Sequence, residues 1–331
     1  MNTLAATMDI GFHPAFALIL GGLVAAVLRG RYASMALVIA PILGFWQVYE
    51  LDIGSLSSMT LFGYDIIGVE VDKQAKVFGY LFHLAALVAG IYSFHVRDPW
   101  QISMALFYAA SAVGVAFAGD MISLFLWWEG LAITSVFQIW GRKTKEAEES
   151  GFRYLFFHVS SGLLLLAGIL FRYHGEGPSA FLLEPLTESL EAGDLGSWLI
   201  LLAIGIKAAF PGLHTWLKDG YSEATPTGPV WLCAFTTKCA VCMLVRLFPG
   251  ADILITIGGV MAMFPIFYAV IENDLRRVLC YSKINQIGFM VVGIGIGTEL
   301  AIDGAIAHAF NHVLYKGLLF MRMGAVLFRQ G

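Results

Sequence analysis

The sequence is dominated by a succession of apolar segments, each about as long as the hydrocarbon core of a lipid bilayer is thick. A membrane-spanning helix needs ~20 mainly apolar residues, and a helix satisfies its own backbone hydrogen bonds inside lipid. Only 13% of the residues are charged, compared with about one-quarter in soluble domains. We therefore predict an all-α polytopic membrane protein with about 11 transmembrane helices. The expected spans lie near residues 13–28, 34–50, 77–96, 102–119, 121–141, 153–173, 196–217, 228–249, 252–271, 278–297 and 302–328.

The basic residues between these segments gather on one side of the membrane. If the N-terminus lies outside, eleven of them are cytoplasmic and four are external. Cytoplasmic loops are enriched in Lys and Arg, so we expect an external N-terminus. The net charge of −4 offers no basic patch for nucleic acid. The cytoplasmic set is Arg29, Arg31, Arg97, Arg142, Lys143, Lys145, Arg153, Lys218, Arg276, Arg277 and Arg329, and the external set is Lys73, Lys76, Arg172 and Arg246.

The segment LLAIGIKAAFPGLHTWLKDG, residues 201–220, combines two features that are costly in a membrane helix. Lys207 lies about eleven residues from either end of its span, too deep for its ammonium to reach the interface. Pro211 has no N–H, so the carbonyl of Lys207 loses its helical partner. A broken helix at membrane depth is tolerated where its backbone is buried in protein or lines a water-filled cavity. We expect one hydrated site around Lys207 and Pro211; a permanently paired structural lysine is the alternative.

Two more charged residues lie deep inside expected spans. Glu129 is the only acid in such a position, and Lys207 is its expected partner because a lone buried carboxylate needs a counter-charge. Lys238 lies about ten residues into the span that follows Lys207, again too deep to reach the interface. Two neighbouring lysines repel when both are charged, which favours passing one proton between them. The alternative for Lys238 is an ammonium held by backbone carbonyls.

The segment AIAHAFNHVLYKGLLFMRMG places His308, His312 and Lys316 on one helix face, at i, i+4 and i+8. Histidines at this spacing can bind zinc, but no third ligand lies nearby, so we predict no metal site. The polar stripe favours a hydrogen-bonded proton path, with structural histidines as the alternative. Lys283 and Arg322 lie nearer the cytoplasmic ends of their spans, where we expect their side chains to extend to the interface.

The four cysteines, Cys233, Cys239, Cys242 and Cys280, all lie in or beside apolar segments. The stretch CAVC, residues 239–242, has the C-x-x-C spacing of redox motifs, but no βαβ pattern surrounds it. We therefore expect small apolar packing residues rather than a redox pair. The sequence contains no flavin, haem or iron–sulfur ligand set, so we expect no cofactor in this chain.

Three long segments resemble the proton-translocating antiporter-like subunits, namely KAAFPGLHTWLKDGYSEATPTGPV, ENDLRRVLCYSKINQIGFMVVGIGIG and AHAFNHVLYKGLLFM. That family includes the large membrane subunits of respiratory complex I, related membrane hydrogenases, and Mrp-type multisubunit cation/proton antiporters. The resemblance runs from about residue 76 to the end. The stretch from Phe264 to Ala301 resembles the D-like subunits of Mrp-type antiporters most.

The resemblance implies inverted five-helix repeats, each with a discontinuous helix, the first around Lys207–Pro211. Residues 1–76 would be accessory transmembrane helices, 77–250 the first repeat and 251–331 part of the second. It also implies a location in the bacterial cytoplasmic (inner) membrane, within a hetero-oligomeric complex in contact with lipid, protons and monovalent cations. The proton-transfer residues that it implies are Glu129, Lys207, Lys238, His308, His312 and Lys316, with Pro211 at the helix break.

The sequence departs from the family pattern at its end. Family chains continue after the span at 302–328 with further helices, including a second broken helix, whereas this sequence ends at LFRQG. We expect a chain truncated at its C-terminus; helices supplied by another polypeptide are the alternative.

Three functions remain open from the sequence. The first is the proton-conducting subunit of a multisubunit Na⁺/H⁺ antiporter, a secondary transporter and not an enzyme. The second is a proton-pumping subunit of a complex I-like NADH-quinone oxidoreductase or a membrane-bound hydrogenase. The third is a non-conducting scaffold subunit.

Overall fold

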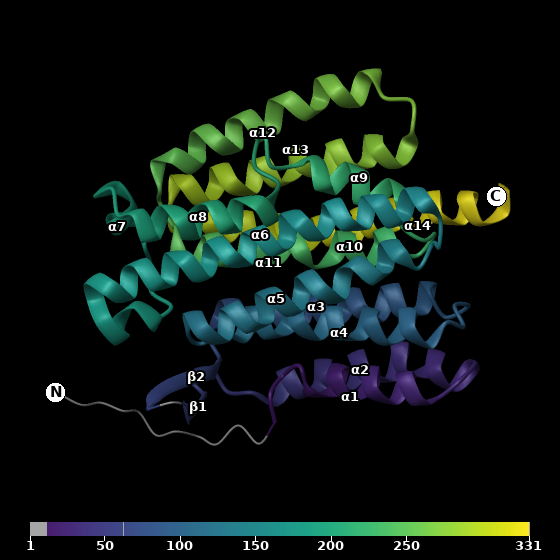
Figure 1. Ribbon diagram of the computed structural model, residues 1–331, viewed down its shortest axis with the longest axis horizontal. Coiled ribbons are helices and arrows are strands. Elements are labelled where there is room, and N and C mark those ends of the chain that lie inside the picture. The colour runs from purple at the N-terminus through teal and green to yellow at the C-terminus, as the bar shows by residue number, and fades with distance from the viewer. Residues whose placement is uncertain (1–11, 62, 331) are drawn as a thin grey trace.

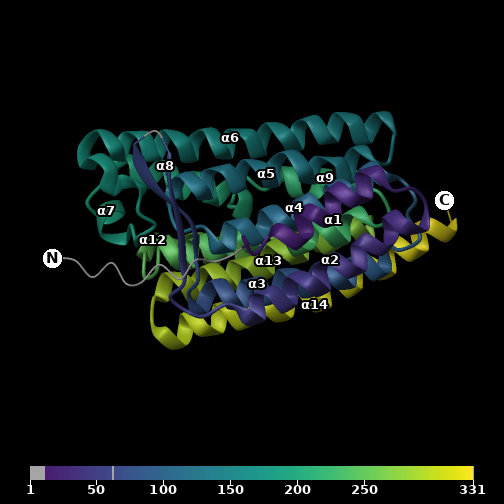
Figure 2. The same cartoon turned by 90° about the horizontal axis from the view of Figure 1, so that it is seen from below.

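The computed structural model describes residues 12–61 and 63–330, and its long helices run side by side along one axis (Figures 1 and 2). The β-hairpin and the short helix α7 lie at one end of this bundle, and the C-terminus lies at the other (Figure 1). In chain order the elements are α1 (Phe16–Val27), α2 (Arg31–Glu50), β1 (Leu56–Leu61), β2 (Tyr64–Glu70), α3 (Lys73–Tyr92), α4 (Pro99–Phe117), α5 (Met121–Trp140), α6 (Lys145–Glu176), η1 (Gly177–Phe181), α7 (Thr187–Glu191), α8 (Leu195–Ala208), α9 (Thr215–Glu223), α10 (Gly228–Ala234), α11 (Thr236–Leu247), α12 (Asp252–Ile271), α13 (Leu275–Ile296) and α14 (Glu299–Gln330).

Polar residues between the apolar segments start many of these helices. A side-chain oxygen at the N-cap position accepts a hydrogen bond from a backbone N–H that the helix leaves unpaired. Asp120 caps α5 in this way and forms a capping box with Ser123. The same contact starts α3, α4, α6, α8 and α13, at Asp72, Asp98, Thr144, Asp194 and Asp274. The boundaries of the helices are therefore encoded locally.

Among the described residues, eight helical segments are long and apolar enough to cross a membrane, and the chain is a polytopic helical membrane protein. The other three expected spans take different forms. Helix α1 has 12 residues, and α8 has 14 because it ends at the break after Lys207. Helix α14 has 32 residues, and the polar residues His308, His312 and Lys316 interrupt its apolar sequence.

The connection between the expected spans at 34–50 and 77–96 contains a two-stranded antiparallel hairpin. The backbone of Ile67 in β2 is held by the start of α5. Its N–H donates to the Asp120 carboxylate at 2.5 Å, and its carbonyl accepts from Ser123 Oγ at 3.1 Å. The structure is therefore not helical throughout. The residues that cap α5 also hold strand β2 in place through hydrogen bonds to the backbone of Ile67.

The α10–α11 segment forms the centre of the bundle and α12 part of its surface. In their apolar windows 94% of the residues of α10–α11 are buried, but only 22% of those of α12. Large apolar side chains of α12 such as Phe267 and Val270 are exposed, as expected for a helix that faces lipid. Helix α12 packs closely on α13 at Gly258, where an added Cβ would lie 2.7 Å from the backbone nitrogen of Val292.

Candidate proton-transfer site

Lys207 lies at a break between helices α8 and α9, as the sequence predicts. Helix α8 ends at Ala208, and Ala209 adopts a left-handed conformation with φ of 65°. The Lys207 side chain is 0% exposed. Its Nζ donates to the carbonyl oxygen of Trp128 at 2.5 Å and lies 4.3 Å from the centre of the Trp128 ring. A lysine, a tryptophan and a helix end thus form one buried site between α5 and α8.

The broken end of α8 is closed by a side chain from α9. The indole N–H of Trp216 donates to the carbonyl oxygen of Ile206 at 2.9 Å. Pro211 cannot provide an N–H to this helix end, and a buried carbonyl without a partner is costly. Trp216 therefore stabilises the break directly beside Lys207.

Glu129 lies one residue after the carbonyl that accepts from Lys207, but the expected direct ion pair is not formed. The ion pairs found among residues 12–61 and 63–330 do not include Glu129. Its carboxylate packs on Gly162 of α6, where an added Cβ would collide with Oε1. Oε1 is buried and has no hydrogen-bond partner among the described protein groups. The physical reason is that the ammonium of Lys207 is directed to the Trp128 carbonyl instead.

Lys238 lies in the first turn of α11, just after a kink that the sequence analysis did not predict. The expected span at 228–249 is divided into α10 and α11 at Phe235. Lys238 is 0% exposed, and its Nζ lies 2.5 Å from Nδ1 of His312 on α14. A lysine and a histidine far apart in sequence therefore share a buried hydrogen bond.

The stripe on α14 is confirmed as one helix face. The rings of His308 and His312 stack with centroids 6.2 Å apart. His312 and Lys316 are buried and His308 is half-buried. Lys316 donates from Nζ to Ser282 Oγ on α13 at 2.7 Å. The stripe thus connects the Lys238 site to α13.

The prediction that Lys283 extends to the interface is wrong. Lys283 is 0% exposed. Its Nζ donates to the Tyr221 hydroxyl at 2.7 Å and to the carbonyl of Cys233 at 3.2 Å. That carbonyl is available because α10 ends at Ala234, so the unpredicted kink creates the binding site for the ammonium. Arg322, by contrast, is exposed, in agreement with the prediction.

His158 on α6 is a buried titratable residue that the sequence analysis did not consider. It is 0% exposed, and neither ring nitrogen has a hydrogen-bond partner among the described protein groups. Its ring lies 4.1 Å from that of Tyr154 and 4.5 Å from that of Trp216. The signal was present in the sequence, since His158 lies in the interior of an apolar span, as Lys207 does.

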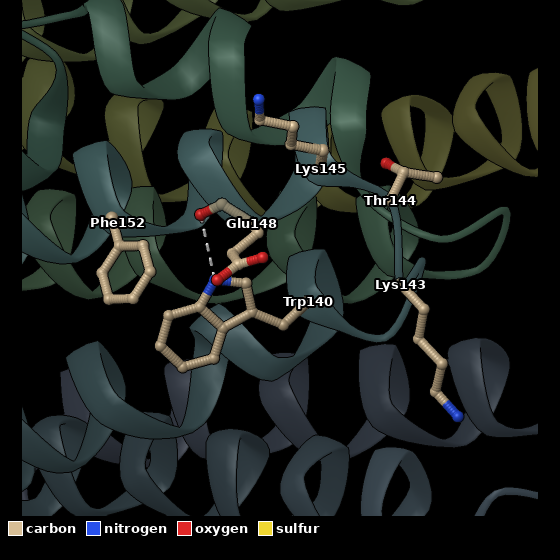
Figure 3. A pocket seen from close by; sticks show the side chains of 6 residues that line it. All are labelled: Trp140, Lys143, Thr144, Lys145, Glu148 and Phe152. Atoms are coloured by element: carbon tan, nitrogen blue, oxygen red, sulfur yellow. Dashed lines mark hydrogen bonds between the residues drawn. The ribbon is translucent and has the colours of Figure 1, made fainter.

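A pocket at the turn between α5 and α6 lies apart from these buried residues. It has a volume of about 470 Å³, and within it the indole N–H of Trp140 donates to the carbonyl oxygen of Glu148 at 3.3 Å (Figure 3). Aromatic and basic side chains together are typical of the membrane–water interface. The residues that line it are Trp140, Lys143, Thr144, Lys145, Glu148 and Phe152.

The four cysteines are free and buried. Cys239 Sγ lies 3.9 Å from the carbonyl of Ala112, and Cys242 Sγ lies 3.5 Å from Gln74 Nε2. The two thiols of the CAVC stretch thus face different neighbours, in agreement with a packing role.

Replacing Cys239 and Cys242 together with alanine is expected to leave the activity of the protein within about twofold of wild type, because each thiol acts as a small apolar group. The measurement is the activity per amount of protein in the membrane, with and without a thiol oxidant. Loss of activity, or sensitivity to the oxidant only in the wild type, would assign the pair a redox role.

The fold and the buried site define a helical membrane protein with titratable side chains across its interior. Residues 118–331 match the family model described as NADH:quinone oxidoreductase/Mrp antiporter, TM, and the chain belongs to this family. NADH-quinone oxidoreductase subunit N of Desulforudis audaxviator (strain MP104C) is 32% identical over 273 residues, which cover 76% of this chain and 54% of the relative.

The chain is also similar to a protein named as an antiporter subunit and to a chain of an Mrp complex. A Na(+)/H(+) antiporter subunit of Alkalihalophilus pseudofirmus (strain ATCC BAA-2126 / JCM 17055 / OF4) is 28% identical over 243 residues, or 69% of this chain and 49% of that protein. A chain of the Mrp complex from Dietzia sp. DQ12-45-1b superposes with a TM-score of 0.84 at 26% identity, covering 97% of this chain and 38% of that one. The chain spans about half the length of the curated relatives described here.

Proposed function

We propose that this chain is a proton-conducting subunit of a multisubunit monovalent cation (Na⁺)/H⁺ antiporter. The proposal rests on one observation, a set of buried lysines on four helices, α8, α11, α13 and α14. Lys207, Lys238 and Lys283 are 0% exposed and Lys316 is 1% exposed. Buried charges are costly in a membrane interior and usually belong to an ion pathway or a proton relay.

Two of these lysines form hydrogen bonds that bring them close to other titratable residues. Lys238 contacts His312, one helical turn from Lys316, and Lys207 contacts α5 immediately beside Glu129. In the proposed path protons move among Glu129, Lys207, Lys238, His312, His308 and Lys316. The chain would act with other subunits in a bacterial cytoplasmic membrane, with its N-terminus outside. Residues 1–76 would be accessory, 77–250 the first repeat and 251–331 part of the second.

A second candidate function is a proton-pumping membrane subunit of a complex I-like oxidoreductase or a membrane-bound hydrogenase. The 32% identity to an NADH-quinone oxidoreductase subunit favours it. The resemblance of residues 264–301 to D-like subunits, and the superposition on an Mrp chain, favour the antiporter.

An assay of everted vesicles that contain the whole native complex separates the two functions. A proton gradient is imposed without any electron donor, sodium is added, and a pH-sensitive dye follows the collapse of the gradient. The antiporter predicts collapse that depends on sodium. No response to sodium, together with acidification of the vesicle interior when an electron donor is added, would assign the chain to the redox-driven class.

Replacing Pro211 with alanine is expected to lower the transport rate roughly tenfold without loss of the complex. Alanine provides an N–H and removes a barrier to helix continuation that costs about 3 kcal/mol, so α8 can extend past Ala209 and displace the Lys207 site. The vesicle assay measures the rate, with Pro265→Ala, a change inside the continuous helix α12, as the control. Wild-type transport by Pro211→Ala would make the break incidental.

A further inference from the structure

Between Lys207 and Lys238 lies a cluster of buried polar side chains that the proposed path has not yet included. Its members come from four helices, α4, α5, α6 and α11, and none is more than 1% exposed. They are Tyr108, Ser135, Tyr154, His158 and Thr236. Polar groups are rarely placed in the interior of a membrane protein without a structural or functional role.

The hydroxyl groups of the cluster meet in two hydrogen-bonded pairs. Tyr154 donates to Ser135 Oγ at 2.9 Å. The Tyr108 hydroxyl lies 2.5 Å from Thr236 Oγ1 and accepts from the backbone N–H of Thr236 at 3.1 Å. The two pairs lie beside each other, although no direct hydrogen bond joins the Tyr154 hydroxyl to Thr236. Four hydroxyls thus gather beside the kink between α10 and α11.

The cluster reaches Lys238 at one end. Thr236 lies two residues before Lys238, and the Lys238 ammonium approaches the hydroxyl of the intervening Thr237 at 3.5 Å. Both threonines directly follow the break at Phe235, whose φ and ψ of −106° and −69° depart from ideal α-helical values.

His158 connects the cluster to the Lys207 site at the other end. Its ring centroid lies 4.1 Å from that of Tyr154, in a tilted arrangement, and 4.5 Å from that of Trp216, in an edge-to-face arrangement. Trp216 in turn donates a hydrogen bond to the carbonyl of Ile206, the residue that precedes Lys207. The face of α6 that contains His158 also contacts Trp128, through Ser161 Oγ at 2.9 Å.

We propose that His158, Tyr154, Thr236 and Tyr108 form a proton relay that connects Lys207 to Lys238. This inference rests on the proposed function and names the route between its two central lysines. The unprotonated ring nitrogen of His158 accepts a proton from the Lys207 ammonium through one bridging water, and the other ring nitrogen releases its proton to the Tyr154 hydroxyl. From the hydroxyls of Tyr108 and Thr236 the proton passes, by way of the Thr237 hydroxyl, to the neutral amine of Lys238. Each hydroxyl is both a donor and an acceptor. At every transfer one N–H or O–H bond breaks as the next forms, so nothing is oxidised or reduced.

The test uses two variants that remove the transferring atoms and keep the rings. Tyr154→Phe deletes one hydroxyl, and His158→Phe deletes both nitrogens while keeping an aromatic ring against Trp216. In the sodium-driven vesicle assay of the whole complex, each variant is expected to slow proton-coupled transport on the order of tenfold or more. The double variant is expected to be no slower than the slower single variant, because residues that act as a unit are not additive.

Tyr92→Phe is the matched control. Tyr92 also donates a hydrogen bond between helices, to the carbonyl of Met321 at 2.9 Å, but lies outside the cluster. Rates are normalised to assembled complex and measured in H₂O and D₂O. A relay variant is expected to change the solvent isotope effect, whereas Tyr92→Phe is expected to leave it at the wild-type value. A purely structural role would lower complex content without changing the isotope effect.

The outcomes separate the relay from the function on which it rests. Inactive Lys207→Ala with wild-type rates and isotope effects in Tyr154→Phe and His158→Phe would overturn the relay alone. Full transport in Lys207→Ala would overturn the proposed function instead. Slow transport with an altered isotope effect in both relay variants, and not in the control, would support the proposed route.

Discussion

Replacing Lys207 with alanine is expected to abolish coupled transport while the complex still assembles. Lys207 is the fully buried cation at the helix break, and its ammonium bonds the carbonyl that precedes Glu129. Without it, no titratable group occupies this position, and we expect a loss on the order of 10²-fold or more. The measurement is sodium-dependent collapse of an imposed proton gradient in everted vesicles, normalised to complex content.

Two further variants make the Lys207 result specific. Lys207→Met keeps an unbranched side chain of similar length without the charge, so it separates the loss of the proton acceptor from the cavity that alanine creates. Lys145→Ala removes a lysine whose side chain is 84% exposed, and we expect transport within about twofold of wild type because single surface changes have small effects. Normal transport in both Lys207 variants would remove the central element of the proposed path.

Replacing Lys238 with methionine is expected to reduce transport nearly as strongly, on the order of 10²-fold. Lys238 shares a buried hydrogen bond with a histidine, its Nζ lying 2.5 Å from His312 Nδ1. Its loss separates the Lys207 site from the stripe on α14. The same vesicle assay gives the rate, and the yield of purified complex shows whether the variant assembles.

The partner residue provides an internal test of this contact. If Lys238 and His312 pass the same proton, His312→Leu is slow too, and the double variant is no slower than Lys238→Met. Lys76→Met is the control, since Lys76 also donates to a carbonyl, that of Leu51 at 2.6 Å, but lies in the first turn of α3. Independent, multiplicative losses in the double variant would place the two residues on separate routes.

The buried lysines differ in how far the sequence could predict their surroundings. For Lys207 the distance to both span ends and the nearby Pro211 were sufficient, because the cost of a charge in lipid and the missing N–H of proline are local properties. For Lys283 the same reasoning failed. Its position just after Arg276 and Arg277 indicates the end of a span, yet its ammonium finds carbonyls at a kink after α10 that no local pattern indicates.

The ion pair expected between Glu129 and Lys207 illustrates a second limit. Sequence position places both residues in the membrane interior, but it does not say which oxygen the ammonium reaches. In the folded chain Lys207 bonds the carbonyl of Trp128, and the Glu129 carboxylate packs on Gly162. A difference of one residue along α5 decides between an ion pair and a hydrogen bond to a carbonyl.

The sequence by itself determined that this chain crosses a membrane repeatedly, that one helix breaks beside Lys207, and that His308, His312 and Lys316 share a helix face. Each of these follows from the length, spacing and backbone chemistry of neighbouring residues. Only the tertiary structure decided that Lys238 meets His312, that Lys283 is buried, and that His158 and Tyr154 adjoin the hydroxyls near Lys238. These contacts join helices far apart in sequence, so they depend on how the helices pack and on the kink between α10 and α11.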